Sequence, residues 1–396
     1  METAGIICEY NPLHFGHAAH IEKTRAALGG ECGIVCAMSG NFVQRGDFAA
    51  FGKHARAEAA VRCGADLVVE IPSPYVLLSA EGYAAAGVHI LDKLGLCGYL
   101  SFGSESGDLG ALKEVAGALV SEEAEERTRE WLGKGLPYAS ARQRAAEAVL
   151  GGRSEALMSP NNLLGVEYLK AIGAQKSALK PMTVRRSGGA HDGDCGYSAS
   201  ALRGKMQAGD PTWQDMMPRA AAEVFLREAA GGRGPVSVAS YELAMLSRLR
   251  ALGDFSGLPG ASEGLDRRFL RYAASEPTVA RVLEGAKTKR YAMSRIRRMM
   301  LCACLGIADA DSREPPPYIR VLAMNRRGMG LLREARGRAE LPIITKPASA
   351  GRIPGRAAEI FAKESAATDF YVLAFRDEDE KSGGREWRQT PVVIDD

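Results

Sequence analysis

The sequence predicts an α/β fold, with a doubly wound parallel sheet followed by a mainly helical C-terminal half. Four short apolar runs occur in the first hundred residues, at Gly5–Cys8, Gly33–Met38, Asp66–Ile71 and Gly98–Phe102. Longer segments with helical spacing of apolar residues separate them, and this alternation is typical of βαβ units. The runs are continuous rather than alternating, as expected for parallel strands buried on both faces. After about residue 215 the alternation is lost and helical patterns dominate.

The remaining elements follow from the same periodicities. The expected helices between the first runs are Ala18–Leu28, Lys53–Cys63 and Ala80–Leu94. Residues 108–172 have helical patterns throughout, Pro181–Arg186 predicts a further strand, and Ser198–Met206 predicts a helix with a serine near its start.

The change of pattern near Gly209–Pro218 divides the chain into two predicted domains, residues 1–210 and 211–396. The polar, acidic residues 376–396 are expected to form a loosely ordered tail.

Charge and composition narrow the class of protein. The 396 residues carry a formal net charge of +3, but the C-terminal half is basic: between Arg281 and Arg298 seven cations face one acid, Glu284. No export signal and no apolar run long enough to span a membrane are seen, so we expect a cytoplasmic protein. The cysteines lack zinc-site spacing, so no metal site is predicted in the protein itself.

A cluster of histidines marks the most specific motif. His14, His17 and His20 fall within seven residues, directly after the first predicted strand and at the start of the first predicted helix. A doubly wound sheet binds ligands at this point, where the carboxyl ends of strands meet a helix N-terminus.

These residue types suit the binding of a nucleotide triphosphate. Gly16 has no Cβ and lets the backbone approach a phosphate, while Pro12 fixes the turn out of the strand. His14 and His17 can donate hydrogen bonds to phosphate oxygens and stabilise the charge on departing pyrophosphate. Capping or surface histidines are one alternative. A metal held by the three imidazoles is another, weakened because Glu9 is the only acidic residue nearby.

Three later loops offer supporting groups. Met38–Asp47 follows the second strand, and Arg45, Lys53 and Arg56 could contact an anion there. Gly103 follows the fourth strand and leaves room for an adenine or ribose. Ser198 and Arg203 could form another phosphate cradle at a helix start.

Several of these segments together resemble the bacterial tRNA(Met) cytidine acetate ligase family, within the HxGH nucleotidyltransferase superfamily and its Rossmann-like fold. The segments that carry the resemblance occur in order along the chain: Gly5–His20, Met38–Gly46, Ala65–Pro72, Phe102–Glu105, Ser159–Gly165, Ser198–Arg203 and Pro317–Asn325. Leu13 and Phe15 stand where relatives commonly have Phe and Asn.

The resemblance implies an ATP-dependent ligase without acetyl-coenzyme A or any tightly bound organic cofactor. Acetate is activated as acetyl-adenylate and transferred to the N4 amine of the wobble cytidine of elongator tRNA(Met), giving N4-acetylcytidine. Mg²⁺ would accompany ATP. His14 and His17 are the implied catalytic residues. The expected ATP contacts, with the Ser198–Arg203 cradle included, are Ile7, Cys8, Glu9, Tyr10, Asn11, Pro12, Leu13, His14, Phe15, Gly16, His17, Ala18, Ala19, His20, Gly103, Asn162, Arg186, Ser198 and Arg203. Asn161 and Arg185 remain alternatives to their neighbours Asn162 and Arg186.

The basic C-terminal half fits an RNA partner. Arg290, Arg295, Arg297 and Arg298 are expected to contact the tRNA backbone. Tyr291 and Tyr318 are candidates for stacking on bases. The main alternative is a small-molecule adenylyl- or nucleotidyltransferase of the same superfamily, which would not need this basic half.

Overall fold

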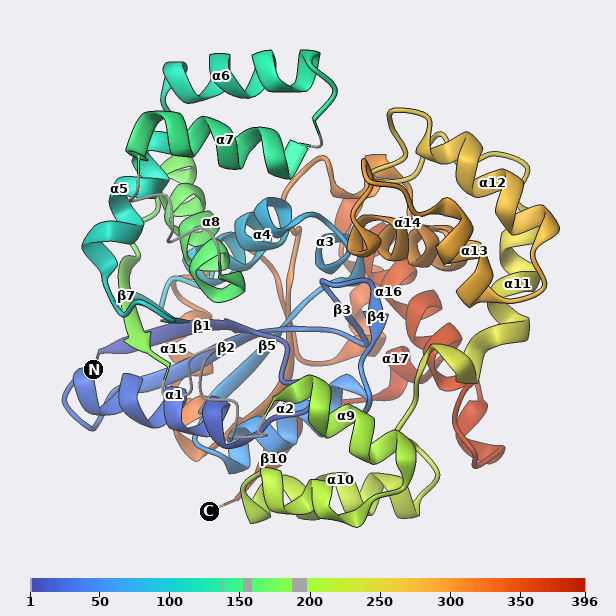
Figure 1. The fold of residues 1–396 in the computed structure, drawn as a ribbon. Helices are drawn as coiled ribbons and strands as arrows, with labels where there is room; N and C mark the ends of the chain where they lie inside the picture. The colour runs from blue at the N-terminus through green and yellow to red at the C-terminus, as the bar shows by residue number, and fades with distance from the viewer. Residues whose placement is uncertain (1, 137, 152–158, 187–197, 396) are drawn as a thin grey trace.

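A mixed sheet organises the molecule in the computed structural model, which describes residues 2–136, 138–151, 159–186 and 198–395 (Figure 1). Within these residues the strand order is β10-β8-β5-β2-β1-β6-β7, and β9 pairs with β8. The strands are β1 (Thr3–Cys8), β2 (Gly33–Ser39), β5 (Leu67–Ile71), β6 (Tyr99–Ser104), β7 (Lys180–Arg185), β8 (Ile319–Asn325), β9 (Ile343–Ile344) and β10 (Val392–Ile394). The five strands expected from the first half of the sequence are confirmed within two residues at each end.

Helices cover both faces of the sheet. Figure 1 shows α4 and α8 above the sheet and α1 and α2 below it. Alternate strand residues explain this arrangement: Ile7 and Val35 join the core under α4 and α8, whereas Ile6 and Cys36 join the core with α1 and α2. The first-half helices are α1 (Phe15–Ala27), α2 (Lys53–Arg62), α3 (Ser73–Val76), α4 (Ala80–Lys93), α5 (Leu109–Leu119), α6 (Glu122–Gly133), α7 (Tyr138–Leu150), α8 (Pro160–Gln175) and α9 (Ala199–Ala208).

The second half is mainly helical, as expected. Its helices are α10 (Arg219–Ala230), α11 (Glu242–Ala251), α12 (Leu265–Ser275), α13 (Val279–Ala286), α14 (Met293–Leu305), α15 (Arg326–Ala335), α16 (Arg356–Val372) and α17 (Arg385–Arg388). None of the described helices combines the length and apolar character that a membrane crossing requires.

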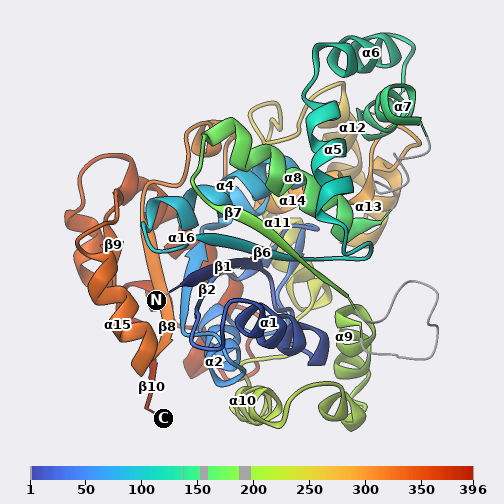
Figure 2. The same ribbon diagram turned by 90° about the vertical axis from the view of Figure 1, so that its left-hand side faces the viewer.

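The second half also returns to the sheet, which the sequence patterns did not indicate. β8 lies antiparallel beside β5, and β10 pairs with β8 at the sheet edge (Figure 2). Arg320 interrupts the apolar run of β8 but is fully buried, because its guanidinium is paired with Glu386. A hydrophobicity pattern does not reveal a buried ion pair, so it does not predict this strand. The division at residue 210 stays a prediction.

A small hairpin after β2 joins the sheet to the helical half. β3 (Phe42–Val43) and β4 (Asp47–Phe48) carry Phe48 into the core of helices α11–α14 and α16. The Phe48 ring stacks on Tyr241 with centroids 3.8 Å apart. The loop that follows β2 is thus held by residues about 200 positions later in the chain.

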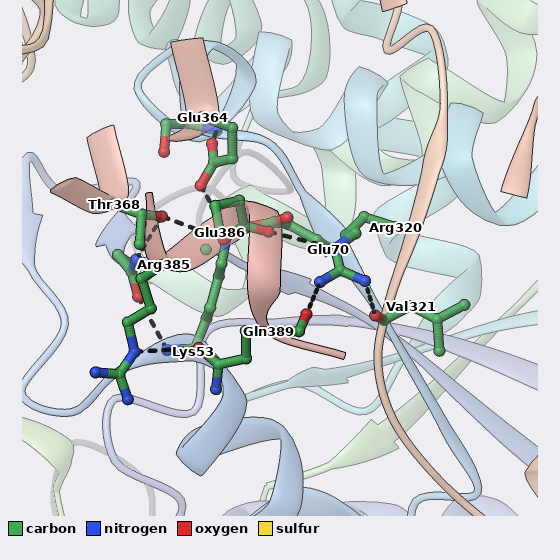
Figure 3. Close-up of polar contacts among 12 residues, drawn as sticks. Lys53, Glu70, Arg320, Val321, Glu364, Thr368, Arg385, Glu386 and Gln389 are labelled. Atoms are coloured by element: carbon green, nitrogen blue, oxygen red, sulfur yellow. Dashed lines mark hydrogen bonds and ion pairs between the residues drawn. The ribbon is translucent and has the colours of Figure 1, made fainter. Parts of the chain in front are cut away.

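The C-terminal residues are not a loose tail, contrary to the sequence-based expectation. Glu386 of α17 is 1% exposed, and its carboxylate lies 2.8 Å from Lys53 Nζ (Figure 3). Glu70 and Glu364 also contact Lys53 Nζ, at 2.6 and 3.0 Å. The prediction that Lys53 contacts a bound anion is therefore wrong, because three buried carboxylates surround its ammonium group.

Candidate active site

The candidate site lies where the order of the strands in the sheet reverses. From β1 the chain proceeds to β2 and β5 on one side, and later to β6 and β7 on the other. β1 is parallel to both of its neighbours, β2 and β6. In such sheets the loops leaving the two central strands diverge and open a crevice at their carboxyl ends. The histidine motif follows β1 directly, so the structure places it at this switch point.

The backbone of the loop after β1 is firmly anchored. The Asn11 side-chain oxygen accepts a hydrogen bond from Ala50 N at 2.8 Å, and the Asn11 carbonyl accepts one from Arg203 at 2.8 Å. Leu13 is fully buried in the core with α1 and α2, while its neighbour Phe15 is 46% exposed. The chain thus passes from the buried stretch 11–14 to exposed residues at the start of α1.

His14 and His17 lie together at the start of α1. His14 is the N-cap, and its Nδ1 accepts a hydrogen bond from Gly16 N at 3.1 Å. His17 Nδ1 accepts one from His14 N at 3.4 Å, and the two ring centroids are 3.9 Å apart. Because Nδ1 is the acceptor in both rings, each neutral imidazole carries its proton on Nε2. Two Nε2–H donors thus stand beside the positive end of the α1 dipole.

Both histidines are held in the neutral form. Burial, helped by the positive charge of Arg186, lowers the pKa of His14 to about 4. Burial, and then His14 itself, lowers the pKa of His17 well below its ordinary value. The pKa of His20 also falls to about 4 through burial, and its Nε2 contacts Ser101 Oγ at 3.0 Å. At neutral pH the rings are hydrogen-bond donors rather than cations.

The far wall of the site is formed by β6, β7 and the start of α8. Arg186 follows β7 and donates to the Asn161 side-chain oxygen at 2.9 Å. Asn162 is buried and its side-chain oxygen accepts from Glu105 N at 2.9 Å. Gly103 faces Arg186, because a Cβ at that position would lie 3.1 Å from Arg186 Cγ. Asn161 therefore touches the arginine that faces the histidines, whereas Asn162 holds the loop after β6.

The expected cradle at α9 has two different parts. Ser198 caps the helix by accepting from Ala201 N at 3.1 Å. Arg203 donates to the Asn11 carbonyl, so it touches the loop that precedes His14. Arg203 is thus part of the histidine site, while Ser198 stands at the exposed helix start.

Arg56 is a structural residue, not an anion contact as the sequence suggested. It is fully buried and donates to four backbone carbonyls, those of Glu9, Ser39, Gly40 and Phe51. These carbonyls belong to the ends of β1 and β2 and to the loop before α2. Arg56 therefore fixes the two loops that lead away from the switch point, and only its contacts, not its sequence context, reveal this.

The four arginines expected to contact RNA have different surroundings. Arg290 and Arg295 both pair with Glu263, at 3.5 and 2.9 Å. Arg298 is partly buried and donates to the Gln44 carbonyl at 3.4 Å, while Arg297 is exposed. Stacking of bases on Tyr291 and Tyr318 is contradicted, because the two rings are 6% and 0% exposed.

The similarity of this chain to known proteins agrees with the geometry of the site. A model of the HIGH Nucleotidyl Transferase family matches residues 1–386. The mainly parallel sheet with paired histidines at its switch point is accordingly that of a HIGH-type nucleotidyltransferase.

Full-length relatives narrow the assignment. The tRNA(Met) cytidine acetate ligase of Caldanaerobacter subterraneus subsp. tengcongensis is 36% identical over 95% of this chain and 96% of its own length. That of Syntrophotalea carbinolica is 37% identical over 87% and 85%. The chain belongs to the tRNA(Met) cytidine acetate ligase family. The crystal structure of Thermotoga maritima TmcAL bound with alpha-thio ATP is also similar, with a TM-score of 0.92 and 31% identity over both whole chains.

Proposed function

We propose that this chain activates acetate with ATP and transfers the acetyl group to the wobble cytidine of elongator tRNA(Met), giving N4-acetylcytidine. The observation that carries the proposal is the pair of Nε2–H donors of His14 and His17 at the N-terminus of α1. The relatives' name supplies the substrate, and the ATP analogue in the Thermotoga maritima structure supplies the nucleotide.

The first step is attack of an acetate oxygen on the α-phosphorus of ATP. A carboxylate–phosphorus bond forms, the bond to the β-phosphate bridging oxygen breaks, and pyrophosphate takes the electron pair. His14 and His17 donate hydrogen bonds to phosphate oxygens as this charge develops, and Arg186 adds a positive charge nearby. Neutral imidazoles fixed by backbone groups need no reorientation during the step.

The nucleotide contacts are the residues around this pair. We assign ATP to the stretch Ile7–His20, with Gly103, Arg186, Ser198 and Arg203 around it. Of the asparagine doublet, the contact of Asn161 with Arg186 supports Asn161 as a direct neighbour of the nucleotide, and Asn162 acts by holding the loop after β6.

Any Mg²⁺ would be held chiefly by the triphosphate. Among the described residues no group of three His, Cys, Asp or Glu side chains is arranged to bind a metal ion. Mg²⁺ keeps most of its ligands as phosphate and water oxygens in nucleotide sites, so the lack of such a group here is compatible with a metal that arrives with ATP.

The tRNA would lie across the basic second half of the chain, residues 211–396, in the cytoplasm where ATP and tRNA are available. Arg297 is the best placed of the four arginines to contact tRNA near the histidines. Its side chain is exposed, and its positive charge interacts with Asp47 in the loop after β2. That loop also contacts Glu9 beside the histidines.

Labelled acetate, ATP and bulk bacterial tRNA test the proposal directly. We expect label in a cytidine of elongator tRNA(Met), accompanied by AMP and pyrophosphate. Omission of ATP, or its replacement with acetyl-coenzyme A, should leave the tRNA unlabelled. If ATP is consumed but label never reaches a cytidine, a small-molecule adenylyltransferase is the better description.

A further inference from the structure

Glu9 lies at the switch point, inside the stretch assigned to ATP, but its carboxylate has no evident part in holding phosphates. It is the residue directly after β1, and Tyr10, the next residue, has its ring 5.0 Å from the His17 ring. An ionised carboxylate is repelled by a triphosphate, so a phosphate contact does not explain the carboxylate of Glu9. The side chain is half-buried, unlike the fully buried Glu70 and Glu364 of the Lys53 cluster.

The Glu9 carboxylate is held in place by the loop after β2. Its Oε1 accepts a hydrogen bond from Gln44 N at 2.6 Å. The same loop is rigidly backed: Gly46 has a φ of +77°, and a Cβ there would lie 2.5 Å from Arg298 N of α14. A side chain held through one oxygen by a fixed loop has a defined position at the carboxyl end of β1.

The charged and titratable groups that face Glu9 come from four elements and one loop. They are Arg45 in the loop after β2, Arg56 on α2, Arg203 on α9, Tyr83 on α4 and Tyr168 on α8. Burial raises the pKa of Glu9, and the hydrogen bond from Gln44 and the arginines oppose this. A raised pKa makes the carboxylate a stronger base near neutral pH.

Two other carboxylates near the site are less suited to accept a proton. Both oxygens of Glu105 are occupied, Oε1 by Asn161 Nδ2 at 2.5 Å and Oε2 by Ser159 Oγ at 2.7 Å. Burial would raise the pKa of Glu105, but these hydrogen bonds hold it below its ordinary value. Asp47 has a raised pKa through burial but lies at β4, the far end of the loop, facing Arg203 and Arg297.

We propose that Glu9 is the general base of the second half-reaction, in which the cytidine N4 amine attacks the acetyl carbon of acetyl-adenylate. The N4–carbon bond forms, the bond between the acetyl carbon and the phosphate oxygen breaks, and AMP leaves with that electron pair. The N4 proton passes to the Glu9 carboxylate. The first half-reaction transfers no proton, so it does not need Glu9 as a base. This inference rests on the proposed function.

Glu9→Gln separates the two half-reactions. The amide oxygen can still accept from Gln44 N, but the side chain no longer takes a proton. We expect the loss of acetate-dependent ATP–pyrophosphate exchange to be at least about tenfold smaller than the loss of acetyl transfer, because only transfer uses Glu9 as a base. Single-turnover transfer from preformed acetyl-adenylate to tRNA should fall about 100-fold or more, since general base catalysis contributes roughly 10²–10⁴-fold. The matched control is Asp47→Asn, which removes another carboxylate of raised pKa and should retain both rates.

The wild-type pH profile tests the proposal without any variant. Transfer should rise with pH as the Glu9 carboxyl loses its proton, and exchange should not follow the same curve. Equal losses of exchange and transfer in Glu9→Gln, wild-type transfer by Glu9→Gln, or a flat wild-type transfer profile would overturn it. Failure of the wild-type protein to label tRNA at all would instead refute the proposed function, and the inference with it.

Discussion

At the residue scale, His14 has a structural role through one ring nitrogen and a chemical role through the other. Its Nδ1 caps α1 by accepting from Gly16 N, and the same bond leaves the ring proton on Nε2. A histidine is an unusual N-cap, because Asn, Asp, Ser and Thr perform that task at least as well. The imidazole is therefore better explained by its second nitrogen than by the cap.

His14→Asn separates these two parts. Asparagine is a preferred N-cap, so the thermal midpoint should stay within a few degrees of wild type. The Nε2–H donor is lost, however, and acetate-dependent ATP–pyrophosphate exchange should fall about 100-fold, the cost of removing one preorganised donor. His17→Ala should abolish exchange while leaving the fold intact. His89→Ala, a half-buried histidine of α4, serves as the control. Wild-type exchange by both motif variants would remove the role assigned to the pair.

At the element scale, the sequence predicts best those strands and helices that have a recognisable pattern in their own residues. The four opening strands are continuous apolar runs, and α1 begins at the His-Phe-Gly-His turn of residues 14–17, so fold and histidine site could both be predicted from local patterns. β8 and α17 could not, because Arg320 and Glu386 look like exposed charges until they are seen to pair across 66 positions. The sequence does not reveal the roles of Lys53 and Arg56 for the same reason, because their partners are carboxylates and carbonyls elsewhere in the chain.

Glu386→Gln tests whether α17 is part of the core. Lys53 and Arg320 would each lose a buried carboxylate partner, and breaking such a pair costs about 3–5 kcal/mol. We expect a thermal midpoint lower by about 5 °C or more. Glu378→Gln changes an exposed glutamate of the same segment and should leave the midpoint unchanged. Equal midpoints for the two variants would show that residues 376–395 contribute no core interaction.

The contacts of the α14 arginines indicate which of them is available to bind RNA. Arg297 is exposed, whereas Arg295 is tied to Glu263 and the Gly260 carbonyl. Arg297→Ala should weaken tRNA binding and reduce the slope of log affinity against log salt by about 1. Arg333→Ala on α15, which lies well apart from α14 in Figures 1 and 2, is the matched control. An unchanged slope for Arg297→Ala would place the RNA elsewhere.

At the scale of the whole molecule, the two halves of the chain share one sheet and one ionic cluster. β8 covers the edge of β5, with Val321 opposite Val69. Lys53 and Glu70 come from the first half, while Glu364 and Glu386 come from the second (Figure 3). The loop after β2, which contacts Glu9, is also anchored in the helical core through Phe48. The histidine site is thus supported by residues from nearly the full length of the chain.

A chain cut at residue 210 should therefore not fold by itself. The fragment 1–210 would expose the β5 edge and leave Lys53 with a single carboxylate, and an unpaired strand edge of this kind promotes aggregation. We expect the fragment to be insoluble, or soluble without a cooperative thermal transition and without ATP binding. Co-expression with the fragment 211–396 supplies β8, Glu364 and Glu386 and should restore a soluble complex that binds ATP. A fragment 1–210 that melts cooperatively and binds ATP alone would show that the shared sheet is dispensable, and that the functional division at residue 210 is also a division between independently folding units.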